Sequence, residues 1–156
     1  MSKPTFVYVI YIAATPEQVW HALTDSETSA RYWFGNRVES DWTVGSSFTV
    51  KRGDATTSDM GKVLEYDPPR RLSYTFHPTK DDVKHERPSR VCFELEQQKD
   101  QVKLTVVHDD FEPGSKVFAS ISNGWPLVLS SLKSLLESGR VLRALWYEAE
   151  DEKART

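Results

Sequence analysis

One long amphipathic segment constrains this chain more than any other, and it runs from Ser115 to Gly139. Read at a helical period of about 3.6 residues, its apolar side chains form one broad stripe. The stripe consists of Phe118, Ile121, Trp125, Val128, Leu129, Leu132, Leu135 and Leu136. The polar residues that fall mostly off it are Ser120, Ser122, Ser130, Ser131, Lys133 and Glu137. Gly139 provides the left-handed conformation that commonly ends a helix. Such a stripe must lie on a large apolar surface, which the middle of the chain is expected to supply.

The tripeptide Gly124-Trp125-Pro126 interrupts the pattern of this segment. Proline has no N–H, and its ring crowds the preceding turn, so Pro126 weakens a helix interior. Two interpretations are open. Either the helix begins here with Asn123 as its cap, or one continuous helix is kinked at this point. The kinked helix is the preferred interpretation.

The composition narrows the class of protein. A chain of 156 residues has the length of one domain that folds without disulfide or metal crosslinks. The net charge of -3 argues against nucleic acid as the main partner. Cys92 is the single cysteine, which excludes an intrachain disulfide and fits a reducing, cytoplasmic location. No apolar run reaches membrane-spanning length, and the N-terminus lacks a clear signal-peptide pattern. The 5 Trp, 6 Tyr and 7 Phe residues suit both a core and a pocket for a flat apolar ligand.

The N-terminal part is typical of one strand followed by two short helices. Residues 6–12 are all β-branched or aromatic, which predicts a strand covered on both faces. Thr15 and Gln18 can form a capping box, with Pro16 at the first helical position. The pair Asp25-Ser26 ends this helix and begins a second one over residues 27–33. The expected apolar sides are Val19, Trp20 and Leu23 in the first helix and Ala30, Trp33 and Phe34 in the second.

From residue 37 to residue 109 the pattern indicates strand after strand. The expected strands cover residues 37–41, 48–52, 60–66, 72–77, 90–97 and 101–109, with a charged loop at 79–88. Consecutive strands with short turns make an antiparallel meander. The order of elements predicts an α+β fold, a curved antiparallel sheet of six to seven strands around the long C-terminal helix. Residues 1–139 are expected to form this single domain, and residues 140–156 a helical extension that frays at its charged end.

Several stretches of the chain resemble one known group of proteins. They are Ile12–Asp25, Trp42–Gly45 leading to Phe48, Gly61–Leu72, and Gly124-Trp125 together with Leu132–Gly139. The combination is similar to the SRPBCC superfamily, which has the START-like helix-grip fold, and within it to the activator of heat-shock-protein-90 ATPase homologue family. The resemblance implies a cavity between the sheet and the long helix. It implies no catalytic residue, because members of the superfamily bind lipids, hormones or polyketides, act as cyclases, or assist chaperones without a shared catalytic motif.

The alternation of each strand indicates which side chains face the concave side of the sheet. The candidate cavity residues are Phe48, Val50, Arg52, Tyr74, Phe76, Val91, Phe93 and His108 from the strands and Trp33, Trp125 and Leu129 from the helices. Most of them are expected to be plain core. Tyr74, His108 and Arg52 are the candidates for the few polar contacts of a pocket. For His108, a core histidine with satisfied hydrogen bonds is the preferred interpretation, and an anchor for a ligand carbonyl or hydroxyl is the alternative.

No motif for covalent or metal chemistry is present in the sequence. The four histidines are not paired at zinc-ligand spacing, and the chain has no G-x-S-x-G and no glycine loop for phosphate. No catalytic residue, metal or cofactor is therefore expected. The first functional hypothesis is a non-enzymatic protein that binds a small, flat, mostly apolar molecule. The alternatives are a chaperone-associated module that works through its surface and a polyketide cyclase or aromatase with His108 and Tyr74 as acid–base groups.

Self-association is a further expectation. The first strand has an outward row of Val7, Val9 and Tyr11. The tail adds apolar residues at helical spacing, Val141, Leu142, Leu145 and Trp146. Apolar rows of this kind are rarely left in water, so they favour a homodimer. The alternative is a monomer in which the two short helices shield the strand.

Overall fold

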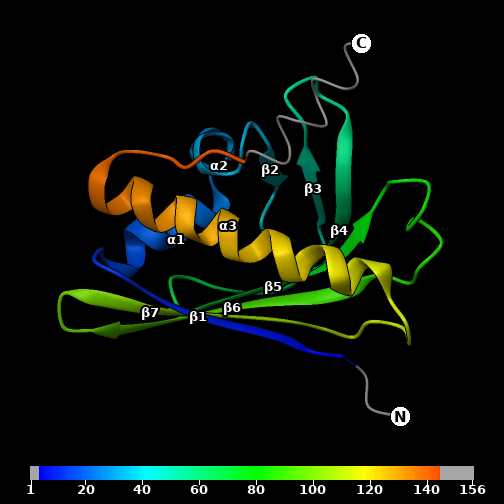
Figure 1. The fold of residues 1–156 in the computed structure, drawn as a ribbon. Helices are drawn as coiled ribbons and strands as arrows, with labels where there is room; N and C mark the ends of the chain where they lie inside the picture. The colour runs from blue at the N-terminus through cyan, green and yellow to red at the C-terminus, as the bar shows by residue number, and fades with distance from the viewer. Residues whose placement is uncertain (1–3, 145–156) are drawn as a thin grey trace.

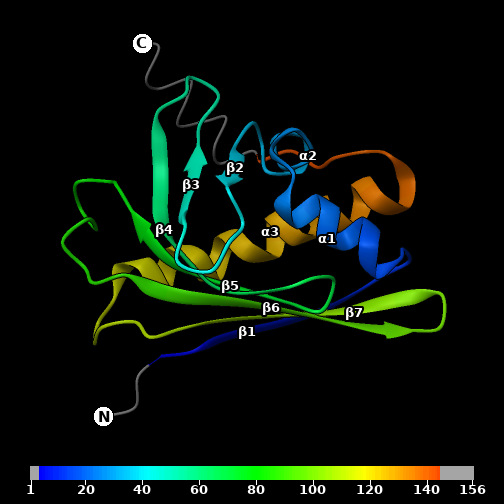
Figure 2. The same cartoon turned by 180° about the vertical axis from the view of Figure 1, so that it is seen from behind.

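A computed structural model, which describes residues 4–144, shows a seven-stranded antiparallel sheet around one long helix (Figure 1). The elements in chain order are β1 (Phe6–Ile12), α1 (Pro16–Thr24), α2 (Ser26–Tyr32), β2 (Arg37–Ser40), β3 (Ser47–Lys51), β4 (Thr57–Asp67), β5 (Arg71–Pro78), β6 (Ser89–Gln98), β7 (Gln101–Asp109) and α3 (Lys116–Ser138). The strand order across the sheet is β1-β7-β6-β5-β4-β3-β2. Figures 1 and 2 show β1, β7, β6 and β5 passing beneath α3, while β3 and β4 turn upward beside it. The predicted helix-grip architecture is confirmed.

The long helix α3 is continuous from Lys116 to Ser138 and contains Pro126 in its interior. Ser115 caps it by accepting a hydrogen bond from the N–H of Phe118 at 3.1 Å. Gly139 ends it with φ of 77°. The interpretation in which the helix begins at Asn123 is therefore wrong. The predicted stripe faces the sheet, with Phe118 and Leu136 only partly buried.

Ser131 departs from the predicted pattern, because it is fully buried although it lies off the apolar stripe. Its hydroxyl oxygen accepts a hydrogen bond from the N–H of Leu142 at 3.1 Å. The chain after α3 thus folds back along the helix, which covers this serine and buries Ala144. Residues 140–144 are not helical, so the predicted helical extension does not begin there. Leu145 and Trp146 lie outside the described residues.

Hydrogen bonds fix the two short helices. The predicted capping box of α1 is present, with the Gln18 N–H donating to Thr15 Oγ1 at 3.2 Å. Helix α2 buries Ser29 and Tyr32, whereas the predicted face of Ala30, Trp33 and Phe34 is only partly buried. Polar partners explain the correction. The Tyr32 hydroxyl donates to the carbonyl of Ala22 at 2.9 Å, and Ser29 Oγ accepts from the N–H of Val38 at 2.9 Å.

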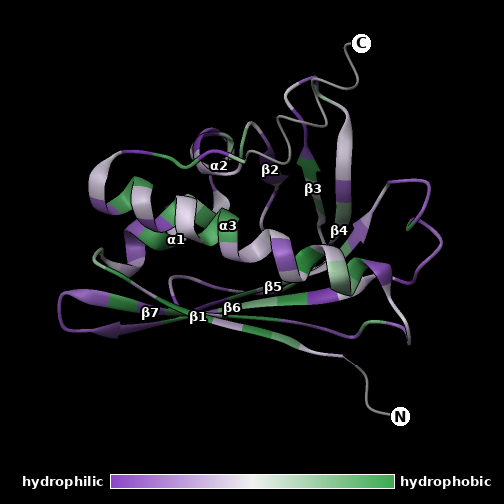
Figure 3. Ribbon diagram, viewed as in Figure 1, coloured by the Kyte–Doolittle hydropathy of each residue, from purple (hydrophilic) through white to green (hydrophobic). Residues whose placement is uncertain are grey.

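The change of direction in the sheet occurs between β4 and β5. A Cβ atom added at Gly61 would lie 1.8 Å from the backbone oxygen of Thr75, so only glycine permits this approach. The N–H of Lys62 donates to Thr75 Oγ1 at 2.8 Å, and the pairing shifts register between Val63 and Glu65. The charged loop of residues 79–88 follows β5 and is mostly hydrophilic (Figure 3).

The edge strand β1 is covered on one face only. Its outward side chains Val7, Val9 and Tyr11 are 57%, 44% and 45% exposed, so the expectation that both faces are covered is wrong within the described chain. Helix α3 is tied to the end of this strand, since Lys133 Nζ donates to the carbonyl of Tyr11 at 2.7 Å. None of the helices within residues 4–144 is long and apolar enough to cross a membrane.

Candidate ligand-binding pocket

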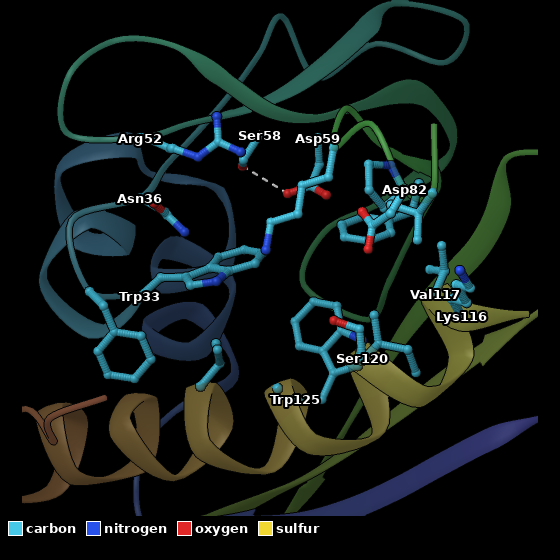
Figure 4. Close-up of a pocket in the computed structure, with 18 residues that line it drawn as sticks. Trp33, Asn36, Arg52, Ser58, Asp59, Asp82, Lys116, Val117, Ser120 and Trp125 are labelled. Carbon is cyan, nitrogen blue, oxygen red and sulfur yellow. Dashed lines mark hydrogen bonds between the residues drawn. The ribbon is translucent and has the colours of Figure 1, made fainter. Parts of the chain in front are cut away.

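A pocket of about 290 Å³ opens beside the N-terminal half of α3 (Figure 4). Its walls come from α3, from the end of α2, from the facing ends of β3, β4 and β5, and from the loop after β5. This volume is close to the lower end of the ~300–1,000 Å³ typical of small-molecule sites. The sheet bend and α2 therefore leave room at one end of the space that α3 spans.

One side of the pocket is aromatic and aliphatic. The ring centroids of Trp33 and Trp125 are 5.5 Å apart, and those of Phe76 and Trp125 are 6.4 Å apart. Helix α3 adds Val117, Ile121 and Val128 from its buried face, with Val117 one turn before Ile121 and Val128 two turns after it. The planes of Trp33 and Phe76 are tilted by 49° and 47° to that of Trp125, and the three rings give a flat apolar molecule surfaces to stack against.

The other side of the pocket is polar, and Asp59 is its central residue. Its carboxylate is half-buried, and Ser58 Oγ donates to Asp59 Oδ2 at 2.8 Å. Burial raises the pKa of Asp59 to about 6, although the Ser58 hydrogen bond and the charges of Arg52 and Lys80 act in the opposite direction. Asp59 therefore titrates close to neutral pH, which is typical of carboxyl groups in functional pockets.

Two further polar groups border the same space. The Arg52 guanidinium donates from Nη1 to Thr56 Oγ1 at 3.2 Å and to the Thr57 carbonyl at 3.3 Å, which fixes its position. Asn36 Oδ1 is the one buried side-chain oxygen or nitrogen among the described residues that has no hydrogen-bond partner. A buried acceptor without a hydrogen-bond partner costs about 1–3 kcal/mol of stability. In a pocket wall, such an atom is a candidate to accept a hydrogen bond from a ligand.

His108 lies beneath Trp125 and does not line the pocket. The Trp125 indole N–H donates to His108 Nδ1 at 3.0 Å, so the ring proton must reside on Nε2. The Nε2–H of His108 then donates to Ser89 Oγ at 2.7 Å, and the Ser89 hydroxyl in turn donates to the carbonyl of Phe76 at 3.1 Å. Burial lowers the pKa of His108 to about 3. His108 is thus a neutral core histidine with both nitrogens bonded, as the preferred interpretation held.

The predicted cavity residues divide into two groups. Trp33, Arg52, Phe76 and Trp125 line the pocket. The others are buried in the core and do not line it, namely Phe48, Val50, Tyr74, Val91, Phe93, His108 and Leu129. Tyr74, for example, stacks on Phe48 with ring centroids 3.8 Å apart, and burial raises the pKa of its phenol well above the usual range. Strand parity identifies the concave face of the sheet, but it does not indicate which part of that face α3 leaves open.

Sequence reasoning missed Asp59, Asn36 and the rim residues Lys80, Asp82 and Lys116. The fourth strand was expected to begin at Met60, whereas β4 begins at Thr57. With the earlier start, Asp59 and Gly61 share the parity of the buried Val63 and would have been assigned to the concave face. The rim residues come from a loop and a helix start, where no periodicity indicates direction.

Among the described residues, no group of three or more His, Cys, Asp or Glu side chains could hold a metal ion. The polar side of the pocket instead offers two carboxylates, one amide and three cationic side chains at or near its rim. Such a set can hydrogen-bond one polar edge of an otherwise apolar molecule.

Comparison with known proteins gives one family and a large set of similar folds. The sequence model of the family described as Activator of Hsp90 ATPase homolog 1-like protein matches residues 13–137. Among solved structures, the Aha1 dimer from Colwellia psychrerythraea is 23% identical with a TM-score of 0.71, over 87% of this chain and 98% of that one. An HSP90 activator from Plasmodium falciparum is 22% identical with a TM-score of 0.71, over 85% and 95% of the two chains. Protein MLL2253 from Mesorhizobium loti is 25% identical with a TM-score of 0.74, over 86% and 97%. No protein of curated function matches the sequence.

Proposed function

The chain belongs to the family of Activator of Hsp90 ATPase homolog 1-like proteins, and on that premise we propose that it binds a small, flat, mostly apolar molecule between α3 and the sheet. The observation that supports this function is the pocket in which Trp33, Phe76 and Trp125 oppose the half-buried Asp59. A core of ordinary packing density would fill this space with side chains. Here an apolar wall and a polar edge border about 290 Å³ of open volume.

The size of the pocket limits the ligand. A volume near the lower end of the usual range suits a system of two or three rings better than a long lipid chain. The cyclase or aromatase alternative loses its acid–base pair, because neither His108 nor Tyr74 lines the pocket. A binding role without catalysis remains the hypothesis that fits these side chains best.

Thermal melts with a panel of flavonoids, naphthols and small polyketides test the proposed function. A ligand at about 100 times its Kd stabilises the folded state by about 2.7 kcal/mol, which raises the melting temperature. The variant Trp33→Ala, which removes part of the aromatic wall, is expected to abolish this rise. Its control is Trp42→Ala, because Trp42 does not line the pocket. If no compound shifts the melt, or if Trp33→Ala and Trp42→Ala respond alike, the pocket is not a ligand site.

The chaperone-associated alternative rests on the family and on two similar folds. The Colwellia psychrerythraea and Plasmodium falciparum proteins are described as Aha1 and as an HSP90 activator. Sequence identities of 23% and 22% to them show a shared fold and not a shared function. A chaperone role would use the surface of the molecule and not the pocket. Titration with purified heat-shock protein 90 would favour this alternative if binding survived the loss of ligand binding in Trp33→Ala.

A homodimer stays a prediction for this chain. The outward side chains of Val7, Val9 and Tyr11 are exposed in the described part of the chain, and so are those of Val141 and Leu142. One similar fold, from Colwellia psychrerythraea, was solved as a dimer. Sedimentation at micromolar concentration is expected to show a dimer that deletion of residues 141–156 weakens. A full-length chain that sediments as a monomer at every concentration would contradict the prediction.

A further inference from the structure

Resting on the proposed ligand pocket, we propose that Asp59 selects uncharged ligands that carry a hydroxyl group directly on a flat ring. The hydroxyl would donate its hydrogen bond to the Asp59 carboxylate, while the ring lies against Trp33 and Trp125. The chemical class is therefore a phenol or a fused-ring analogue of a phenol. The inference specifies the ligand of the pocket, and it can fail while the pocket remains a ligand site.

Asp59 has unused capacity to accept hydrogen bonds. A carboxylate offers about four lone-pair positions. Ser58 Oγ occupies one of them, at 2.8 Å from Oδ2. With a pKa of about 6, the group is mostly ionised at neutral pH and then only accepts hydrogen bonds. A ligand that donates would compensate the loss of hydration that burial imposes on this carboxylate, whereas a ligand that only accepts would not.

The charges around the pocket favour an uncharged donor over an ion. Arg52 from the end of β3, Lys80 from the loop after β5 and Lys116 from the start of α3 would repel a cationic ligand. Asp59 itself and Asp82 of the same loop would repel an anionic one. A neutral hydroxyl group meets neither repulsion and still donates.

The pocket geometry brings ring surface and carboxylate to the same space. In Figure 4, Asp59 and Ser58 lie on one side of the open volume and Trp125 and Ser120 on the other, with Trp33 bordering it between them. The indoles of Trp33 and Trp125 pack with their planes tilted by 49° and their ring centroids 5.5 Å apart. A flat ring that extends this aromatic cluster presents its edge, and any hydroxyl on that edge, to Asp59.

Matched naphthalene derivatives test the inference in the intact protein. 2-Naphthol donates a hydrogen bond, 2-methoxynaphthalene has the same ring and oxygen without the donor, and 2-naphthoate adds an anionic group. Titration calorimetry at pH 7.5 is expected to show 2-naphthol binding at least about tenfold more tightly than 2-methoxynaphthalene, the effect of one hydrogen bond to a charged group. Equal affinities for these two ligands would overturn the inference and leave the pocket as an unselective apolar site. Tightest binding of 2-naphthoate would also overturn it, because the basic rim would then select the ligand.

Asp59→Asn identifies the residue that carries the selection. The variant is expected to lose most of the preference for 2-naphthol, because the amide that replaces the carboxylate carries no charge, and measurable binding of 2-methoxynaphthalene would show that the pocket is intact. Asp81→Asn removes the same charge from the neighbouring exposed loop outside the pocket and is expected to keep the preference. A preference that survives Asp59→Asn undiminished would overturn the inference.

The pH dependence gives a readout that needs no variant. A hydroxyl donor binds the ionised form of Asp59, so its affinity is expected to fall as the pH is lowered through about 6. The charged or titratable groups that face Asp59 are Arg52, Lys80, Lys116, Asp82 and the buried Tyr74, and none of these side chains has an ordinary pKa between 5 and 7.5. An affinity for 2-naphthol that stays constant from pH 7.5 to 5, or that rises toward pH 5, would overturn the inference. Binding of none of the three probes would count against the proposed function as well.

Discussion

Trp125 separates two regions under α3, and each contains a titratable side chain in a different environment. On its sheet side lies the sealed core, represented by the fully buried His108 and Leu132 and by the buried Ser89. On its other side lies the pocket with Asp59. Burial favours the neutral form in both places, lowering the pKa of His108 to about 3 and raising that of Asp59 to about 6.

The difference lies in hydrogen bonding and in access. Both ring nitrogens of His108 are bonded within the protein, at 3.0 Å to Trp125 and at 2.7 Å to Ser89. Asp59 accepts one side-chain hydrogen bond, from Ser58, and borders open space. A buried polar group whose hydrogen bonds are all made within the protein serves packing. An accessible polar group with hydrogen-bonding capacity left over can serve recognition. The comparison therefore assigns packing to the His108 side of Trp125, and it supports the proposed binding role of the Asp59 side.

The largest expected effect is acid destabilisation through His108. Its pKa is about 3 in the folded state and about 6.5 when unfolded, so the unfolded state binds more protons between these values. Stability from this group is present above pH 6.5 and is lost as the pH falls, by up to about 5 kcal/mol near pH 3. Urea melts from pH 7 to pH 4 are expected to show a steeper loss in the wild type than in His108→Gln. Parallel curves would mean that His108 is already charged in the folded protein.

Shortening a leucine in the core is expected to lower the free energy of unfolding by less than full protonation of His108 does. Shortening an apolar residue in the pocket wall is expected to lower it by still less. Leu132→Ala in the sealed core should lose about 2–5 kcal/mol, because it leaves a closed cavity. Ile121→Ala enlarges a space that is already open to water, so its loss is expected at or below about 2 kcal/mol. Denaturant melts measure both. A loss below about 0.5 kcal/mol for Leu132→Ala would show that α3 does not pack on the sheet.

Asp59 is expected to act on stability in the opposite direction to His108. Its pKa is raised from 3.8 to about 6, so the folded state binds more protons in this window and stability rises as the pH falls from 6 to 4. Asp59→Asn should stabilise the protein at pH 8 by at most about 3 kcal/mol, and the gain should vanish near pH 4. Asp81→Asn, with an exposed carboxylate, should show no such gain. If Asp59→Asn destabilises the protein at pH 8, the pocket does not disfavour the carboxylate.

Local patterns in the sequence predicted most of the fold. The capping box at Thr15, the stripe on α3 and the alternation of β6 and β7 each depend on residues a few positions apart, so they are readable without the structure. The errors lie where distant partners decide. Ser29 and Ser131 are buried because backbone N–H groups of Val38 and Leu142 donate to their hydroxyl oxygens. No pattern within a helix could indicate these partners.

The sequence by itself determined the α+β arrangement of a curved antiparallel sheet around one long helix, and the core-facing side of most elements other than α2, because periodicity and capping are local properties. Tertiary structure alone decided where the core stops and the pocket begins. That boundary depends on the close approach of Gly61 to Thr75, where the sheet changes direction, and on the position of Trp33 at the end of α2. It separates Phe76, which borders open space, from Tyr74, two residues earlier on the same face, which is packed. Two side chains on the same face of one strand thus differ in their surroundings, because segments distant in sequence pack against one and not against the other.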